Sequence, residues 1–273
     1  MTTAPSTYAL RLSDDELGRY RMMAARARAE EGDLWTAAGI VPGARVADVG
    51  CGPGAMLVTL AELVGPTGHV IGIDADQTAV TAARAALAAA RFGSAVAPGE
   101  VRQGRAESTG LPASSVDTVV LRHVLAHNGH SAQRIVDHLA TLVRPGCHVY
   151  VVDVDLTTTT FTPALPEAVE LTARYHRWHE RQGNDPRIGR RLPTLARAAG
   201  LTVEEYRGWT VDGPVPQGMR GPAWAARDEL VRAGLADAAD VARWDAAFAA
   251  LDEADDRPHI SGSLFAAVCR RPA

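Results

Sequence analysis

The sequence predicts an α/β fold built around a doubly wound, mostly parallel sheet, and three observations support this prediction. The run from Val46 to Gly54 joins a buried-strand pattern directly to a glycine loop. A second apolar strand pattern ends in Asp74, 20 residues beyond Gly54. Strand-like and helix-like segments then alternate as far as Val154. Such alternation is typical of a parallel sheet with right-handed crossover helices.

The elements of the first half can be placed in order along the chain. Ser13 begins a capping box with Asp14, Asp15 and Glu16, which predicts a helix through about Glu31, followed by a further helical turn over 33–38. Apolar runs and helical periodicity predict the core elements that follow. They are strand 45–49, helix 55–64, strand 70–73, a helix through Val80, Ala83, Leu87 and Ala90, strands 100–103 and 115–121, a helix around Ile135–Leu142 and strand 148–154.

The second half is organised differently, with two late strands separated by helices. We expect helices over 166–182 and 191–199, a strand over 201–211, a helical insert over 223–256 and a last strand over 263–269. No internal repeat or low-complexity linker interrupts the chain. One α/β domain carrying helical additions is therefore predicted.

Composition narrows the classes of function. The chain has 273 residues, 47% of them hydrophobic and 22% charged, which is enough to bury a large core. A net charge of -4 gives no basic field for nucleic acid or an anionic membrane. The cysteines at 51, 147 and 269 are isolated, and no leader or long apolar run is evident, so a cytoplasmic location is expected.

The glycine loop predicts a site for a nucleoside-containing ligand. Gly50, Gly52 and Gly54 leave no Cβ in the way of a ligand. Asp74, at the end of the second strand, is placed to accept hydrogen bonds from ribose hydroxyls. The third glycine comes one residue earlier than in the dinucleotide pattern, which argues against a pyrophosphate ligand. A tight turn without a ligand is the alternative interpretation of the loop.

The run Asp48-Val49-Gly50-Cys51-Gly52-Pro53-Gly54 closely resembles motif I of the class I S-adenosylmethionine-dependent methyltransferases, and the similarity to the small-molecule, UbiE-like type continues to about Asp155. This resemblance implies a Rossmann-like sheet of seven strands, parallel except for an antiparallel last strand. It also implies S-adenosylmethionine as cofactor. We divide the chain into a helical cap over 1–40 and a methyltransferase domain over 41–273, with helical lid insertions at about 157–185 and 215–258.

The resemblance also implies which residues bind the cofactor. The loop after the third strand, Gly104 to Glu107, corresponds to the segment that holds the adenine, with Arg105 where the family usually has an acid. Arg122 follows the fourth strand, beside the position of the transferred methyl. The expected cofactor-binding residues are Asp48, Gly50, Cys51, Gly52, Gly54, Asp74, Ala75, Ala106, Glu107 and Arg122.

The acceptor side of the site is predicted from histidines and aromatic residues. Histidine titrates near neutrality and can remove a proton from an acceptor. The candidates for this catalytic role are His123, His127 and His179. Substrate contacts are expected from Tyr20, Met23, Tyr175, His176 and Trp178, although a core-facing or surface role is the alternative for each. No metal is expected, because the paired histidines are not accompanied by paired cysteines.

These features together predict methyl transfer to a small, partly apolar molecule through an O, N or C acceptor, in bacterial specialised metabolism. The expected partner is a small-molecule substrate, without nucleic acid or membrane, and self-association would give a homodimer. Two alternatives remain at this point. One is a methyltransferase acting on protein or RNA, and the other is a scaffold that binds S-adenosylmethionine without catalysis.

Overall fold

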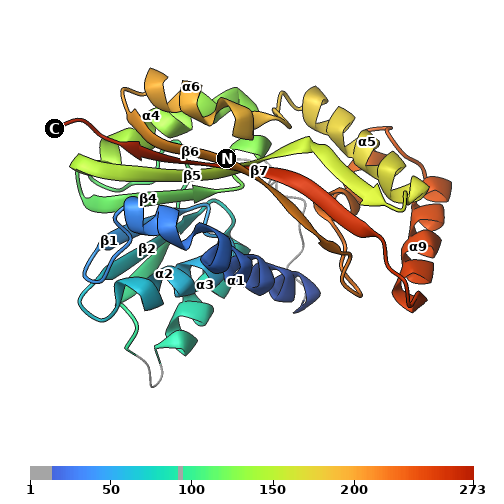
Figure 1. Cartoon of the computed structure of the whole chain (residues 1–273), viewed down its shortest axis with the longest axis horizontal. Coiled ribbons are helices and arrows are strands. Elements are labelled where there is room, and N and C mark those ends of the chain that lie inside the picture. Colours follow the sequence, from blue (N-terminus) through green and yellow to red (C-terminus); the bar gives the residue numbers. More distant parts are fainter. Residues whose placement is uncertain (1–13, 92–94) are drawn as a thin grey trace, which may run out of the picture.

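A computed structural model of the chain describes residues 14–91 and 95–273, and these residues form a mixed sheet of seven strands (Figure 1). Their order across the sheet is β3-β2-β1-β4-β5-β7-β6. Strands β1 to β5 pair in parallel, and β7 runs antiparallel to both of its neighbours, β5 and β6. The strands are β1 Arg45–Val49, β2 His69–Asp74, β3 Gly99–Gln103, β4 Val116–Arg122, β5 Val143–Thr162, β6 Thr202–Pro214 and β7 His259–Arg270. The predicted Rossmann-like sheet is confirmed.

Helices cover both faces of this sheet. In Figure 1, α1, α2 and α3 lie on one face, α4 and α6 lie on the other, and α5 and α9 stand beyond one end of the sheet. The helices are α1 Asp14–Ala37, α2 Ala55–Val64, α3 Gln77–Ala90, α4 Ala132–Leu142, α5 Pro166–Arg181, α6 Leu192–Ala198, α7 Pro222–Ala225, α8 Arg227–Arg232 and α9 Ala238–Glu253. Each parallel crossover therefore buries one face of a strand, as the apolar runs predict.

Side chains on the two faces of the central strands belong to two separate hydrophobic cores. Successive strand side chains point to opposite faces. Val119 and Leu121 of β4 therefore join the core under α4 and α6, whereas Val120 joins the core under α1 to α3. Tyr150 of β5 also lies in the second core and is fully buried.

A third, smaller core lies under the extended ends of β5, β6 and β7. It is formed by Leu171 of α5, Leu230 of α8, and Trp244 and Phe248 of α9. Both Leu230 and Trp244 are fully buried. This core holds the helices of the second half of the chain against the sheet.

The structure corrects the predicted end of the first helix. Instead of ending near Glu31 and restarting, α1 continues without a break to Ala37. Leu34 and Trp35 are almost completely buried in the core, and their burial outweighs the cost of about 1 kcal/mol for Gly32 inside a helix. Ser13, the predicted capping residue, lies outside the described residues.

The structure also corrects the ends of two strands. β5 continues to Thr162, so the first part of the predicted lid insertion at 157–185 is strand, and its helix begins at Pro166. β7 begins at His259 instead of Ser263, because its first residues pair with Thr160–Thr162 of β5. The β-branched threonines before Phe161 suit a pleated strand, and tertiary pairing decides the extension.

None of the helices in the described part of the chain combines the length and the apolar character that crossing a membrane requires.

Candidate active site

The glycine loop lies at the carboxyl end of β1, near the centre of the sheet. Gly50, Gly52 and Gly54 all have positive φ angles, of 75°, 53° and 90°. A Cβ atom on Gly54 would lie 2.8 Å from the Cα atom of Ala83 in α3, so this glycine allows α2 and α3 to pack closely. The loop conformation therefore requires glycine for its backbone angles and, at Gly54, for packing as well.

Asp74 holds the glycine loop from the end of β2. One of its carboxylate oxygens accepts a hydrogen bond from the Gly52 N–H at 2.8 Å, and the other accepts one from the Asp76 N–H at 2.9 Å. Burial is the main cause that raises the pKa of Asp74 above its ordinary value. Each oxygen can accept a second hydrogen bond. Asp74 thus both shapes the loop and keeps acceptor capacity for ribose hydroxyls.

Asp48 brings a buried carboxylate to the same place. Its side chain is 2% exposed, and its Oδ2 atom has no hydrogen-bond partner among the described residues. Burial raises the pKa of Asp48 to about 7, and the nearby Arg122 opposes this shift. The neighbouring Cys51 thiol is also buried, and burial raises its pKa well above the ordinary value. An unpartnered buried oxygen beside the loop is suited to a donor group on a bound ligand.

Arg122, at the end of β4, connects this site to α1. Its Nη2 atom lies 2.5 Å from Oε1 of the buried Glu31, while its Nε atom is buried without a partner in the described chain. Glu31 Oε2 also accepts hydrogen bonds from the Tyr150 hydroxyl at 2.8 Å and from Trp35 Nε1 at 3.3 Å. Sequence patterns missed Glu31 and Tyr150, because they are 91 and 28 residues from Arg122 along the chain. A charged residue on an otherwise core-facing helix stripe is the only signal that points to Glu31.

The predicted adenine loop lies beside Asp74. The Gly104 N–H donates to the Asp74 carbonyl oxygen at 2.9 Å, and Gln103 Nε2 donates to the carbonyl of the exposed Ala75 at 3.0 Å. Glu107 pairs with Arg105 at 2.6 Å, and Ala106 is half-buried between them. The structure therefore brings together, at the carboxyl ends of the parallel strands, the four segments expected to bind the cofactor: the glycine loop, Asp74, the predicted adenine loop and Arg122.

The chain turns sharply after β4, at His123. This residue has a φ angle of 56°, which is uncommon for a residue with a side chain and often marks functional sites. The following turn is held by Asp153, a fully buried residue of β5, which accepts hydrogen bonds from the N–H groups of Leu125 at 2.8 Å and Ala126 at 3.2 Å. Burial raises the pKa of Asp153 to about 7. No sequence pattern pointed to this positioning role of Asp153.

Three aromatic residues of α5 and one histidine after β4 form a cluster of rings, which we call the aromatic cluster: His127, Tyr175, Trp178 and His179. Ring centroids are 5.1 Å apart for His127 and His179, and 4.4 Å apart for Tyr175 and His179. The Trp178 ring meets the His179 ring edge-on at 5.2 Å. His176 makes no ring contact with this cluster among the described residues, although its charge is one of the causes that lower the pKa of His179.

Burial weakens all three predicted histidine bases. It lowers the pKa of His127 to about 4 and is the main cause that lowers the pKa of His179 to about 3. The pKa of His123 is also held well below its ordinary value, by burial first and then by the charge of Arg122. These side chains are neutral near pH 7, but a base with so low a pKa accepts a proton weakly.

Helix α1 also contributes residues to the site. The Tyr20 ring covers the glycine loop, since its Cε1 atom would be 3.5 Å from a Cβ on Gly52. Arg19 donates to the Met23 sulfur at 3.1 Å and lies near enough to Tyr175 and His123 to affect the pKa of both. The residues predicted for the acceptor therefore come together from α1, α5 and the turn after β4, and His176 lies near enough to affect the pKa of His179.

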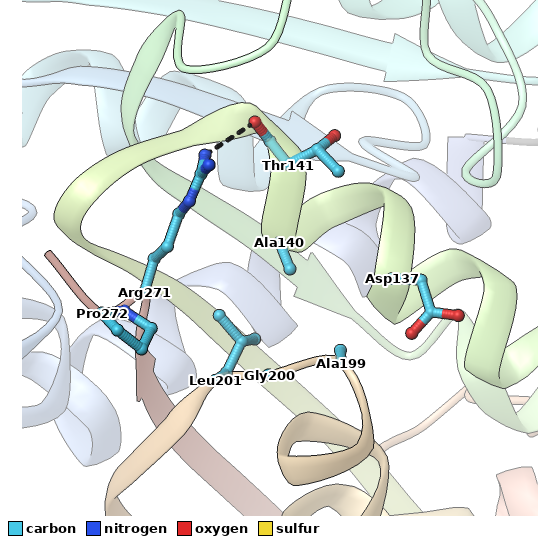
Figure 2. A pocket seen from close by; sticks show the side chains of 8 residues that line it. All are labelled: Asp137, Ala140, Thr141, Ala199, Gly200, Leu201, Arg271 and Pro272. Carbon is cyan, nitrogen blue, oxygen red and sulfur yellow. Dashed lines mark hydrogen bonds between the residues drawn. The ribbon is translucent and has the colours of Figure 1, made fainter.

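A hollow of about 330 Å³ lies elsewhere, between the end of α4, the α6–β6 turn and the C-terminal residues Arg271 and Pro272 (Figure 2). Arg271 reaches into it and donates to the Thr141 carbonyl oxygen at 3.1 Å. Arg270 pairs with His148, which marks this as the amino end of the parallel strands. Ligands of open α/β sheets bind at the opposite, carboxyl end.

No set of three or more histidine, cysteine, aspartate or glutamate side chains within residues 14–91 and 95–273 could hold a metal ion.

Residues 46–146 match a family model described as a methyltransferase domain. This segment of the chain is therefore similar to methyltransferase domains. The matched segment contains the glycine loop, Asp74, the predicted adenine loop and the turn after β4. S-adenosylmethionine is accordingly the cofactor expected in this site.

Three curated proteins are similar in sequence. The chain is 42% identical over 78 residues to the nocamycin O-methyltransferase of Saccharothrix syringae, covering 29% of this chain and 26% of that protein. It is 34% identical over 163 residues to an uncharacterised 37.1 kDa protein in transposon TN4556 of Streptomyces fradiae, covering 59% and 44%. It is 26% identical over 211 residues to the demethylmenaquinone methyltransferase of Lactococcus lactis subsp. lactis, covering 69% and 79%. The chain thus spans less than half the length of the first two relatives.

The fold is also found among solved structures. A crystal structure of a protein assigned as a methyltransferase from Bacillus halodurans superposes with a TM-score of 0.57 at 16% identity. The match covers 90% of this chain and 100% of that one. This similarity shows the shared methyltransferase fold.

The residues of the site fit the expected cofactor. The glycine loop provides a cradle without side chains, Asp74 provides acceptors for hydroxyl groups, and Asp48 provides an unpartnered buried oxygen for an amino group. Arg122 Nε is a buried donor suited to a carboxylate.

Proposed function

We propose that this protein transfers a methyl group from S-adenosylmethionine to a small, partly apolar molecule, through an O, N or C acceptor. One observation supports this proposal above the others. The glycine loop, the turn after β4 and the aromatic cluster lie together at the carboxyl end of the parallel strands. Tyr175 and Trp178 offer apolar and stacking surface to an acceptor. The similarity to a protein named as an O-methyltransferase for nocamycin supports a role in bacterial specialised metabolism.

When bound, S-adenosylmethionine supplies a methyl group on an electrophilic sulfonium centre. The protein's own contribution is then to align, to exclude water and, for some acceptors, to remove a proton. Gly52 and Asp74 position the nucleoside, and α1 and α5 cover the acceptor. His123 and His127 are the side chains we assign to proton removal, because both follow β4 directly. Their low pKa values favour acceptors that need little assistance.

We further propose that residues 1–40 act as a cap, that the segments 157–185 and 215–258 act as a lid, and that the protein works in the cytoplasm as a homodimer. The net charge of -4 supports a small-molecule substrate over nucleic acid. A lid built on the hydrophobic core around Leu171, Leu230 and Trp244 would keep water from the reacting atoms.

Two measurements test the proposed activity. Titration calorimetry should show binding of S-adenosylmethionine and S-adenosylhomocysteine, and mass spectrometry should show a methylated product from a panel of phenols, indoles and amines. Binding without any product would favour the non-catalytic scaffold. Product formed only on protein or RNA would favour a macromolecular substrate, and absence of cofactor binding would refute the proposal.

A further inference from the structure

His179 lies at the centre of the aromatic cluster with an unusual set of hydrogen bonds. Its side chain is fully buried on α5. The Nδ1 atom lies 3.1 Å from Nδ2 of Asn184, in the turn that follows the helix. The Nε2 atom is buried and has no hydrogen-bond partner among the described residues. The position of the ring proton therefore decides what His179 can do.

Asn184 fixes that position, because its own orientation is fixed. Its Oδ1 atom accepts a hydrogen bond from the Gly129 N–H at 3.3 Å, which requires the oxygen on that side of the amide. Gly129 is held close to this turn, since a Cβ on it would lie 2.7 Å from both the Gly183 carbonyl oxygen and the Asp185 nitrogen. The Asn184 NH₂ group consequently faces His179.

An amide NH₂ group can only donate, so Nδ1 of His179 must accept. In a neutral imidazole the proton then sits on Nε2. Burial lowers the pKa of His179 to about 3, which keeps the ring neutral at physiological pH. His179 thus presents a buried N–H donor whose lack of a partner costs about 1 to 3 kcal/mol. A bound group with an acceptor atom would remove this cost.

This tautomer is incompatible with a base at His179. A base needs an available lone pair, and the lone pair on Nδ1 is engaged by Asn184. The Tyr175 and Trp178 rings meet the imidazole edge-on, and the His127 ring lies tilted beside it, so aromatic side chains surround His179. A ligand that matches both features has a planar ring and an oxygen acceptor at its edge.

We propose that His179 is a substrate-binding residue that donates a hydrogen bond from Nε2 to a carbonyl or phenolic oxygen on a planar acceptor molecule. This inference rests on the proposed function and names its substrate class. Donation to a phenolic oxygen would also stabilise the phenolate, the form that attacks a methyl group, once its proton has passed to water or to His123 or His127. The assignment of His179 as a catalytic base is thereby replaced by a binding role.

The first test determines the tautomer directly in the full chain. Long-range ¹H–¹⁵N NMR should show protonation of His179 at Nε2 only, unchanged from pH 8 to pH 5. Asn184→Asp should move the proton to Nδ1, because a carboxylate can only accept. The His179→Gln spectrum assigns the signal, and the half-buried His176 serves as an internal comparison. Protonation of wild-type His179 at Nδ1 would overturn the proposal.

The second test measures oxygen recognition without turnover. With S-adenosylhomocysteine present, acetophenone should bind at least tenfold more tightly than ethylbenzene, which has a similar shape but no oxygen. His179→Phe should abolish this preference, and His179→Gln, which places an amide donor near Nε2, should retain part of it. Equal binding of the two probes, binding of neither, or a preference that persists in His179→Phe would each overturn the proposal. Since S-adenosylhomocysteine binding is measured separately, failure of this subsite is distinguishable from failure of the proposed activity.

Discussion

At the scale of single residues, the cofactor site depends on side chains that serve the loop and the ligand together. Asp74 is the clearest example, because its carboxylate accepts hydrogen bonds from the backbone N–H groups of Gly52 and Asp76. The same carboxylate has the position expected for ribose recognition. Loss of Asp74 therefore removes a ligand contact and a loop constraint in one step.

We expect Asp74→Ala to lower the affinity for S-adenosylmethionine and S-adenosylhomocysteine at least tenfold, because hydrogen bonds to a charged group contribute about 1.5 to 3 kcal/mol each. Titration calorimetry measures this change. Asp76→Ala is the matched control, since it removes only the side-chain cap of α3 on Thr78, at about 1 kcal/mol of stability. Unchanged affinity in a folded Asp74→Ala protein would remove Asp74 from the site.

Substitutions at two glycines of the loop should have different effects, one on cofactor binding and the other on the stability of the fold. Gly52→Val should abolish cofactor binding, because a branched side chain intrudes on the ligand and resists the φ angle of 53°. Gly54→Ala should instead destabilise the fold by about 2 kcal/mol or more, because its Cβ would press on the Ala83 backbone. Calorimetry and urea denaturation distinguish the two effects. Full binding by Gly52→Val would mean that the loop is only a turn.

At the scale of elements, α1 is fastened to the sheet by polar contacts as well as by its core. Glu31 receives Arg122 of β4 and Tyr150 of β5, while Glu30 accepts a hydrogen bond from Trp209 of β6 at 3.0 Å. The Glu31–Arg122 pair is buried. Removing one member of a buried ion pair destabilises a protein, because the charge of the other member is no longer compensated. This pair links the position of α1 to the position of Arg122 beside the cofactor.

Glu31→Gln is expected to destabilise the protein by about 3 kcal/mol or more, because it takes away the only counter-charge within ion-pair distance of the buried Arg122 guanidinium among the described residues. It should also weaken S-adenosylhomocysteine binding. Glu30→Gln, one residue away on the same helix, removes only more exposed contacts and should cost less than about 1 kcal/mol. Urea denaturation compares the two variants, and equal stability of both would contradict a structural role for the pair.

At the scale of the whole molecule, stability depends on pH through titratable groups whose pKa values are shifted in opposite directions by burial. The pKa of His127 is about 4 in the folded protein, against 6.5 when unperturbed. Below pH 6.5 the unfolded chain binds a proton that the folded protein does not, so His127 lowers stability as the pH falls to 4. For Asp153, whose pKa rises from 3.8 to about 7, stability is instead lost as the pH rises through that interval.

Replacing His127 should therefore flatten the acid side of the profile. Between pH 7 and pH 4.5, wild-type protein should lose up to about 3 kcal/mol through this residue, and His127→Leu should not lose that part. Urea midpoints at a series of pH values give the comparison. His130→Leu is the control, because His130 is exposed on the same turn. A profile of His127→Leu parallel to that of the wild-type protein would contradict the lowered pKa of His127.

The sheet and the glycine loop could be predicted from the sequence, because both depend on local patterns. Apolar runs, crossover helices and the spacing from Gly54 to Asp74 lie within short stretches of chain. The limits of α1 and β5 were predicted less well, since burial of Trp35 and pairing with β7 decided them. Only the tertiary structure revealed Glu31 against Arg122, Asp153 under the turn after β4, and Asn184 against His179. These contacts join residues of different elements, so no sequence pattern records them. The position of the proton on His179 follows from the Asn184 amide, which is itself oriented by the Gly129 N–H.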